Sequence, residues 1–215
     1  MNLRRRPGAP ALVVAHRANT LEALAAVREV DLVELDVAPG LVVAHDPGEA
    51  GPSLADALDV LAGRDVGIHV DVKLPGYEPA VLEAIDERRL RDRVLVSTAY
   101  ARVARRVRAL APELPIAIGY PRDRYRVSRF AWPGLVTRPG AAALRAAMPA
   151  RIPPLLAWAR ADALALHHTL CSRAAIEAAH RRGAPVLVWT VDDPAAQERF
   201  SALGVDAVVT DRWLH

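Results

Sequence analysis

Three short segments near the start of the chain carry residue types suited to acid–base and metal chemistry: Ala15-His16-Arg17, Glu34-Leu35-Asp36 and Ala44-His45-Asp46. Each follows a short apolar run that is typical of a β-strand. A fourth segment, Asp71-Val72-Lys73, closes the next apolar run. Histidines, carboxylates and cations therefore gather where parallel strands would end. This layout indicates a metal-dependent site for a phosphate ester.

The carboxylates are spaced so that they share a face. Side chains alternate along a strand, so Glu34 and Asp36 point the same way, and so do His69, Asp71 and Lys73. If both faces point into a barrel, Glu34, Asp36 and Asp71 converge at its C-terminal mouth, where barrel active sites lie. Such carboxylates repel one another unless a cation lies among them. We expect Mg²⁺ or Ca²⁺, which prefer oxygen ligands, rather than zinc, because no imidazole or thiolate set accompanies them.

The remaining polar groups suit phosphate chemistry. Arg17 and Lys73, the only lysine of the chain, can hold phosphate oxygens. His16 and His45 can supply the base and the acid that breaking a P–O bond requires. Taken singly, each of these residues has an ordinary structural explanation, such as an exposed ion pair or a structural histidine at a strand end. Their occurrence together favours a site.

Composition limits the other classes of function. The chain has 215 residues and a net charge of +3, and its basic residues alternate with acidic ones along helix-like stretches, which does not indicate a nucleic-acid partner. Cys171 is the only cysteine, so a disulfide framework is excluded. The apolar stretch Ala9–Ala15 is too short to span a membrane and leads directly into His16 rather than into a cleavage site. We expect one cytoplasmic domain over residues 1–215, without stable membrane insertion; the sequence leaves its oligomeric state open.

Strand-like and helix-like segments alternate along the chain, which is typical of βα units around a parallel sheet. Eight strands favour a compact (β/α)₈ TIM barrel with short loops, and an open doubly wound sheet is the alternative. The predicted strands are Ala11–His16, Leu32–Val37, Gly67–Val72, Arg93–Thr98, Pro115–Tyr120, Ala163–His168, Pro185–Thr190 and Ala207–Thr210. The predicted helices are Leu21–Val30, one that starts at Ser53, Glu78–Arg89, Tyr100–Leu110, Ser172–Arg182 and Pro194–Leu203.

Three segments stand apart from this alternation. Leu41–Asp46, after a Pro39-Gly40 turn, predicts a small extra strand that returns His45 toward the site. The proline-rich stretch Arg122–Arg160 predicts an extended or broken helical connection. His167 and His168 end the sixth predicted strand, so one of them should face the mouth of the barrel.

In these segments, the chain resembles the glycerophosphodiester phosphodiesterase family. The resemblance runs from about residue 11 to residue 212, although the middle third carries no motif, and it is the ordered set that is specific. The matching segments are Val14–Arg17, Asn19–Ala23, Val33–Val37, Val42–Asp46, Val70–Lys73, Val188–Asp192 and Gly204–Arg212.

The resemblance implies a TIM barrel that uses Mg²⁺ or Ca²⁺ to hydrolyse glycerophosphodiesters, or related lysophospholipid-type diesters, to glycerol 3-phosphate and an alcohol. A glycerol hydroxyl would attack the phosphorus before water completes the hydrolysis. The implied roles are acid–base catalysis by His16 and His45, metal binding by Glu34, Asp36 and Asp71, phosphate binding by Arg17 and Lys73, and substrate contact by Trp189.

The chain also departs from the family's pattern. Ala18 leads directly to Asn19, where the family has a glycine and several further residues, and the insertion that commonly follows His45-Asp46 is nearly absent. Asp71 stands where the family usually has a glutamate. These departures predict a more open pocket.

The sequence leaves two other functions open. The contracted first loop and Asp71 fit a non-catalytic barrel that binds an anionic phosphometabolite. An aldolase or isomerase that uses Lys73 is less favoured, because nearby carboxylates would raise the pKa of that lysine rather than lower it.

Overall fold

Eight parallel strands close into a barrel. The computed structural model describes residues 3–6, 8–122 and 134–213, with the side chains of 134–139 and 141 excepted. The sheet closes because β1 pairs with both β2 and β9. The predicted TIM barrel is confirmed, and the open sheet is wrong. The barrel strands are β1 (Leu12–Ala15), β2 (Leu32–Ala38), β4 (Gly67–Val72), β5 (Val94–Thr98), β6 (Ile116–Tyr120), β7 (Ala163–His167), β8 (Val186–Trp189) and β9 (Ala207–Thr210).

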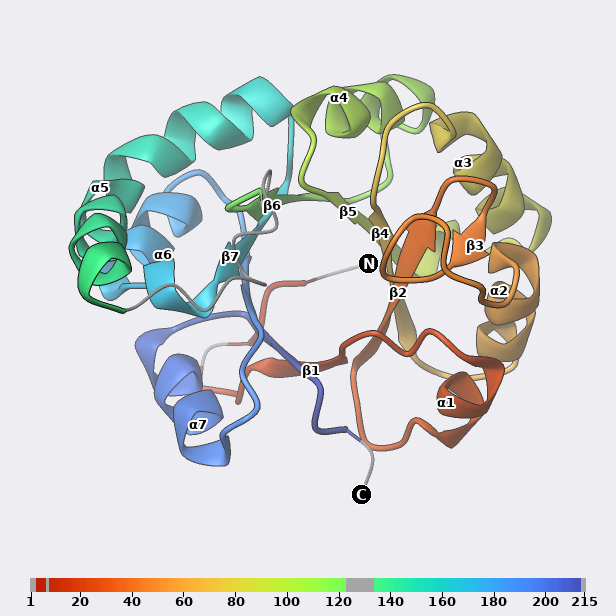
Figure 1. Ribbon diagram of the computed structural model, residues 1–215, viewed down its shortest axis with the longest axis horizontal. Helices are drawn as coiled ribbons and strands as arrows, with labels where there is room; N and C mark the ends of the chain where they lie inside the picture. The colour runs from red at the N-terminus through yellow and green to blue at the C-terminus, as the bar shows by residue number, and fades with distance from the viewer. Residues whose placement is uncertain (1–2, 7, 123–133, 214–215) are drawn as a thin grey trace.

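Helices form an outer ring around these strands (Figure 1). Several begin at a side chain that accepts a hydrogen bond from the backbone N–H three residues on, as Ser53, Ser172 and Asp193 do. The predicted helix Leu21–Val30 ends earlier, at Ala26. The helices are α1 (Leu21–Ala26), α2 (Leu54–Ala62), α3 (Glu78–Glu87), α4 (Ala101–Leu110), α5 (Gly134–Ala159), α6 (Arg173–His180) and α7 (Pro194–Leu203), with 3₁₀ turns at Arg91–Arg93 and His168–Leu170.

Alternation along the strands separates two apolar clusters. On β2, Val33, Leu35 and Val37 pack outward in the larger cluster with the helices. Leu32 of the same strand belongs to a smaller cluster. The members of that cluster on the other strands also alternate with outward-facing residues, so the cluster fills the barrel interior. Glu34 and Asp36 have the parity of Leu32, so they face the interior too. The interior cluster consists of Leu3, Val14, Leu32, Leu95, Ala117, Ala163, Ala165, Leu187, Ala207 and Val209.

The short strand β3 (Val42–Val43) pairs antiparallel with the end of β2, which confirms the predicted extra strand. On its other side, Val43 N–H donates to Pro52 O at 2.8 Å. Gly51 lies so close to β3 that a Cβ atom there would collide with the carbonyl oxygen of Val43. This close approach holds the segment just before His45 against the barrel.

Helix α5 accounts for much of the stretch Arg122–Arg160, of which residues 123–133 lie outside the described part of the chain. A 26-residue helix replaces the predicted extended or broken connection, although it contains four prolines, at positions 139, 149, 153 and 154. Proline weakens a helix by removing a hydrogen bond and crowding the preceding turn. Buried Met148, Ile152 and Leu156 recur every four residues and anchor one face to the core, and Figure 1 shows the helix curving around the barrel.

No helix in the described residues combines the length and the apolar character needed to cross a lipid bilayer.

His69 occupies the barrel interior without a polar partner. It is 4% exposed, and among the described residues neither ring nitrogen has a hydrogen-bond partner. Burial lowers the pKa of His69 to about 4, so the ring is neutral near pH 7. An unpaired buried polar group costs about 1–3 kcal/mol.

We therefore expect His69→Leu to raise the free energy of unfolding by roughly 1–3 kcal/mol at neutral pH, because leucine fills similar space without unpaired nitrogens. Denaturant unfolding followed by circular dichroism measures the change. His69→Gln, which keeps a polar side chain, is the control and should give no gain. A less stable His69→Leu would mean that the imidazole has a polar partner in solution.

Candidate functional site

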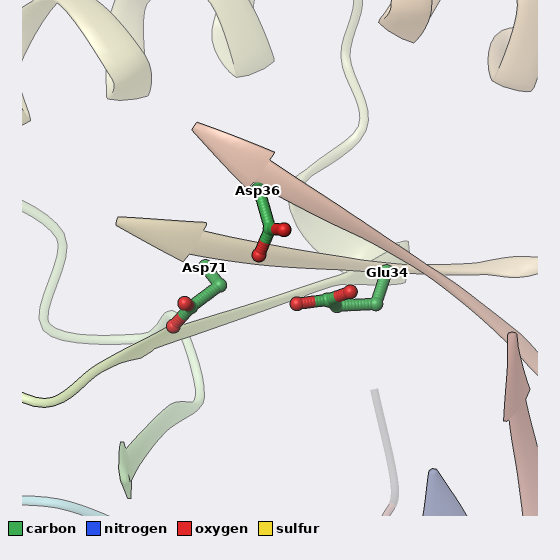
Figure 2. A group of neighbouring side chains, drawn as sticks. All are labelled: Glu34, Asp36 and Asp71. Carbon is green, nitrogen blue, oxygen red and sulfur yellow. The ribbon is translucent and has the colours of Figure 1, made fainter. Parts of the chain in front are cut away.

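Three carboxylates meet at the C-terminal mouth of the barrel, where the sequence predicted them. Glu34 and Asp36 come from β2 and Asp71 from β4, and strand register places Asp36 beside Asp71. One oxygen from each lies within 4.8 Å of the others. Figure 2 shows the three side chains together on the same face of the two neighbouring strands. Their convergence follows from strand alternation and from the parallel pairing of β2 with β4.

Lys73 forms ion pairs with two of these carboxylates. Its Nζ contacts Asp36 Oδ1 and lies 2.7 Å from Asp71 Oδ2. Burial opposes the charged ammonium, but the charges of Asp71, Asp36 and Glu34 outweigh it and raise the pKa of Lys73. The lysine is therefore held charged, the reverse of what an aldolase or isomerase that uses Lys73 requires.

The two aspartates are stabilised as anions. Burial alone would raise the pKa of Asp36, but the hydrogen bond with His45 and the charge of Lys73 together lower it. Burial likewise opposes ionisation of Asp71, while Lys73 and the Ser97 hydroxyl, whose Oγ donates to Asp71 Oδ1 at 2.6 Å, lower its pKa.

Within the part of the chain that the structure describes, Glu34 is the carboxylate of the three that forms no ion pair with an arginine or lysine side chain. It is 4% exposed and accepts a hydrogen bond from the Arg17 backbone N–H at 2.7 Å. Burial, followed by the charge of Asp36, raises the pKa of Glu34 well above its usual value. Three oxygen donors with excess negative charge fit a hard divalent cation.

His45 sits over Asp36. Its Nδ1 lies 2.8 Å from Asp36 Oδ2, and Arg17 Nη2 donates to its Nε2 at 3.1 Å. A guanidinium has no acceptor, so Nε2 accepts and the ring proton is on Nδ1, directed at the carboxylate. The structure thus joins His45 and Arg17 to the carboxylates.

His16 lies on the β1 side of the mouth, 8% exposed, and its Nδ1 is 2.7 Å from Asp211 Oδ1. Its carbonyl accepts from Trp213 Nε1 at 2.9 Å. Burial and the nearby charge of Arg17 lower the pKa of His16, although Asp211 opposes the shift. The ring is therefore neutral near pH 7, and no hydrogen bond within the described residues engages its Nε2.

Two residues complete this arrangement without having been assigned to it from the sequence. Asn19 holds Asp36 at two points, since its Nδ2 donates to Oδ2 at 3.0 Å and its Oδ1 accepts from the Asp36 N–H at 3.1 Å. Asp211 orients His16, and Asp192 Oδ1 accepts from the Asp211 N–H at 2.8 Å. Asn19 lies in a segment that resembles the family, but sequence reasoning assigned it no role. The sequence feature that could have pointed to Asp211 is its position as a carboxylate just after the last strand.

The contracted first loop makes a tight turn. Arg17 has a φ of 55°, in the left-handed region that non-glycine residues rarely adopt. The turn places the Arg17 N–H on Glu34 and the Asn19 side chain on Asp36. The short turn therefore still supplies hydrogen bonds to both Glu34 and Asp36.

Trp189 lies across the mouth. It ends β8, which faces β4 in the cyclic strand order, and its half-buried ring meets His167 edge-on, with centroids 4.8 Å apart. No described contact joins it to the carboxylates, so the structure places it on the opposite wall.

The mouth of the barrel thus carries an acidic cluster and two histidines that each contact a carboxylate, which are residue types suited to a phosphate-ester site. The model of the glycerophosphoryl diester phosphodiesterase family matches residues 49–215. A curated relative, a glycerophosphodiester phosphodiesterase of Caldanaerobacter subterraneus subsp. tengcongensis, is 26% identical over 171 residues. That match covers 76% of this chain, and the chain spans 59% of the relative's length.

Solved structures share the fold. A glycerophosphodiester phosphodiesterase from Parabacteroides distasonis superposes with a TM-score of 0.69 at 16% identity, covering 95% of this chain and 94% of that one. An Oleispira antarctica phosphodiesterase in complex with the product sn-glycerol-3-phosphate gives a TM-score of 0.69 at 19% identity, with coverages of 95% and 94%. The chain belongs to the glycerophosphoryl diester phosphodiesterase family.

We expect Mg²⁺ or Ca²⁺ to stabilise the fold, because a cation relieves the repulsion among the three carboxylates. At a hundredfold excess of the ion over its Kd, binding adds about 2.7 kcal/mol to the free energy of unfolding. Each kcal/mol raises Tm by roughly 2–4 °C for a chain of this size. Differential scanning calorimetry with and without chelator measures it. Glu34→Gln should lose the shift, whereas Asp59→Asn, which changes a carboxylate paired with Arg88 outside the site, should keep it. An equal shift in both variants would place the ion elsewhere.

Lys73→Met should strengthen divalent-cation binding, because the ammonium that contacts both Asp36 and Asp71 competes with the ion for the same oxygens. Isothermal titration with Mg²⁺ or Ca²⁺ should show a Kd at least about tenfold lower, equivalent to about 1.4 kcal/mol. Lys73→Arg, which keeps the charge, is the matched control. Weaker binding in Lys73→Met would show that the lysine organises the carboxylates more than it competes.

Proposed function

We propose that the protein hydrolyses glycerophosphodiesters, or related lysophospholipid-type diesters, to glycerol 3-phosphate and an alcohol. The observation that carries the proposal is the pair of imidazoles at one mouth, each with Nδ1 bound to a carboxylate, beside a cluster suited to a divalent cation. Membership of the family and the likeness to a phosphodiesterase bound to sn-glycerol-3-phosphate support the same substrate class.

In this proposal Glu34, Asp36 and Asp71 hold Mg²⁺ or Ca²⁺, which supplies electrostatic stabilisation of the phosphoryl oxygens. Arg17 and Lys73 bind those oxygens as fixed cations. Both already lie beside the carboxylate cluster, so a phosphate that meets the cluster also meets their charges. Trp189 contacts the organic part of the substrate from the opposite wall.

The two histidines move protons. His16 is neutral, and its Nε2 can accept the proton of a glycerol hydroxyl as that oxygen bonds to phosphorus. The bond from phosphorus to the alcohol oxygen then breaks, and His45 protonates that oxygen from Nε2. This step requires the substrate-bound enzyme to hold His45 as the imidazolium over Asp36, with the Arg17 guanidinium turned from Nε2 onto the phosphate. Water opens the resulting cyclic phosphate by the reverse use of the two rings. Asp211 and Asp36 fix the ring orientations and stabilise the imidazolium forms.

Purified protein should release glycerol 3-phosphate from glycerophosphocholine and glycerophosphoethanolamine, and chelator should abolish the release. His16→Ala and Glu34→Gln should lower kcat by at least about 10³-fold, since each removes a group that acts in the transition state. Asp211→Asn should lower kcat by roughly 10- to 10³-fold with little change in KM, because it releases His16 from its orientation. A coupled assay for glycerol 3-phosphate measures all three.

Asp59→Asn is the control for substitution of a carboxylate outside the site and should keep full activity. Metal-dependent stabilisation without turnover of any diester would overturn the proposal in favour of a barrel that only binds a phosphometabolite. Turnover that survives both chelator and His16→Ala would overturn the assigned roles.

A further inference from the structure

His167 faces the mouth of the barrel. It ends β7, on which Ala163 and Ala165 belong to the interior cluster while Leu164 and Leu166 pack outward. By this alternation His167 points inward. The sequence left His167 and His168 as candidates for the mouth. Strand parity places His167 there, and His168 begins the following 3₁₀ turn with its ring stacked on that of His167.

The proton on His167 can be assigned from its partners. The Thr169 backbone N–H donates to Nδ1 at 3.3 Å, and Thr169 Oγ1 lies 2.8 Å from the same nitrogen. An amide N–H cannot accept, so Nδ1 is the acceptor and the neutral ring carries its proton on Nε2. Burial, followed by the neighbouring His168, lowers the pKa of His167 to about 4. Near pH 7 the ring is therefore an uncharged hydrogen-bond donor through Nε2–H.

Aromatic contacts hold this ring in place. Trp189 meets it edge-on at 4.8 Å with an interplanar angle of 88°, and His168 stacks on it at 4.4 Å. With the Thr169 hydrogen bonds, these contacts limit rotation about both side-chain torsions. A donor restrained in this way binds a partner without a large loss of side-chain entropy.

The wall that carries His167 is opposite the carboxylates. In the cyclic order of the barrel, β7 faces β2 and β8 faces β4. The inward mouth-end position of β6 is Gly119, which has no side chain. Within the described ends of β6, β7 and β8, the inward N–H donors are therefore those of His167 and Trp189. A phosphate bound at the cations directs its organic part toward them.

From this geometry we infer that His167 determines specificity by donating a hydrogen bond from Nε2–H to the terminal hydroxyl oxygen of the substrate's glycerol group, the one that does not attack phosphorus; the inference rests on the proposed function. A neutral N–H requires an acceptor oxygen. It has no favourable interaction with a quaternary ammonium or an alkylammonium, which offer none. The residue therefore recognises the glycerol side of the diester rather than a cationic head group.

The test compares His167→Phe, which keeps the aromatic contact with Trp189 but lacks the donor, with His167→Gln, which restores one. The substrates are glycerophosphocholine, glycerophosphoethanolamine and 2-hydroxyethyl phosphocholine, which keeps the hydroxyl that attacks phosphorus but lacks the terminal hydroxymethyl group of glycerol. We expect His167→Phe to reduce the ratio of kcat/KM for each glycerol ester to that for the hydroxyethyl ester by about tenfold, equally for both head groups. His167→Gln should recover most of the ratio, and Asp59→Asn, which changes a carboxylate on α2 outside the site, should leave it unchanged.

Two outcomes would overturn the inference: an unchanged ratio in His167→Phe, or a loss that depends on the head group. If the wild-type protein hydrolyses no diester, the proposed function fails, but the His167 contact can still be tested by binding. Titration calorimetry with glycerol 3-phosphate and with inorganic phosphate then measures the contact. Wild-type protein should prefer glycerol 3-phosphate, and His167→Phe should lose about tenfold of that preference. Equal preference in both proteins would exclude the contact. Circular dichroism confirms that each variant is folded.

Discussion

Asp36 buries its carboxylate completely at the end of β2, and polar side chains from three other segments converge on it. Asn19 comes from the turn after β1, His45 from the segment after β3 and Lys73 from the end of β4. An isolated buried charge is strongly destabilising, and removing one partner of a buried pair leaves that cost uncompensated. The fold and the site are therefore coupled: the segments that place the polar groups must dock correctly for Asp36 to remain charged.

Much of the barrel was predictable because its signals are local. Short β-branched runs with helical stretches between them indicate parallel βα units, and the eight barrel strands agree with the expected ones to within one residue at each end. Strand alternation also sufficed to bring Glu34, Asp36 and Asp71 together, because parallel pairing of neighbouring strands preserves which side chains face inward. These inferences needed only the order of the segments and the period of a strand.

The contacts that complete the site depend on long-range closure, which a single sequence does not encode locally. Asp211 reaches His16 because β9 pairs with β1, almost 200 residues away in the chain. Asn19 reaches Asp36 because the contracted turn at Arg17 adopts a left-handed conformation. Helix α5 shows the opposite limitation. Its prolines indicate a broken element locally, but burial of Met148, Ile152 and Leu156 against the barrel overrides that preference.

The close approach of Gly51 to β3 links a position with no reactive side chain to the placement of His45. Beside the pairing of β3 with β2 and the hydrogen bond from Ala44 N–H to Asp36 O at 2.9 Å, this contact helps set the height of His45 above Asp36. A methyl group at residue 51 would have to displace Val43, and the imidazole two positions further on would move with it. A larger residue at position 51 would therefore change the spacing between the His45 ring and the carboxylates, although it lies outside the site.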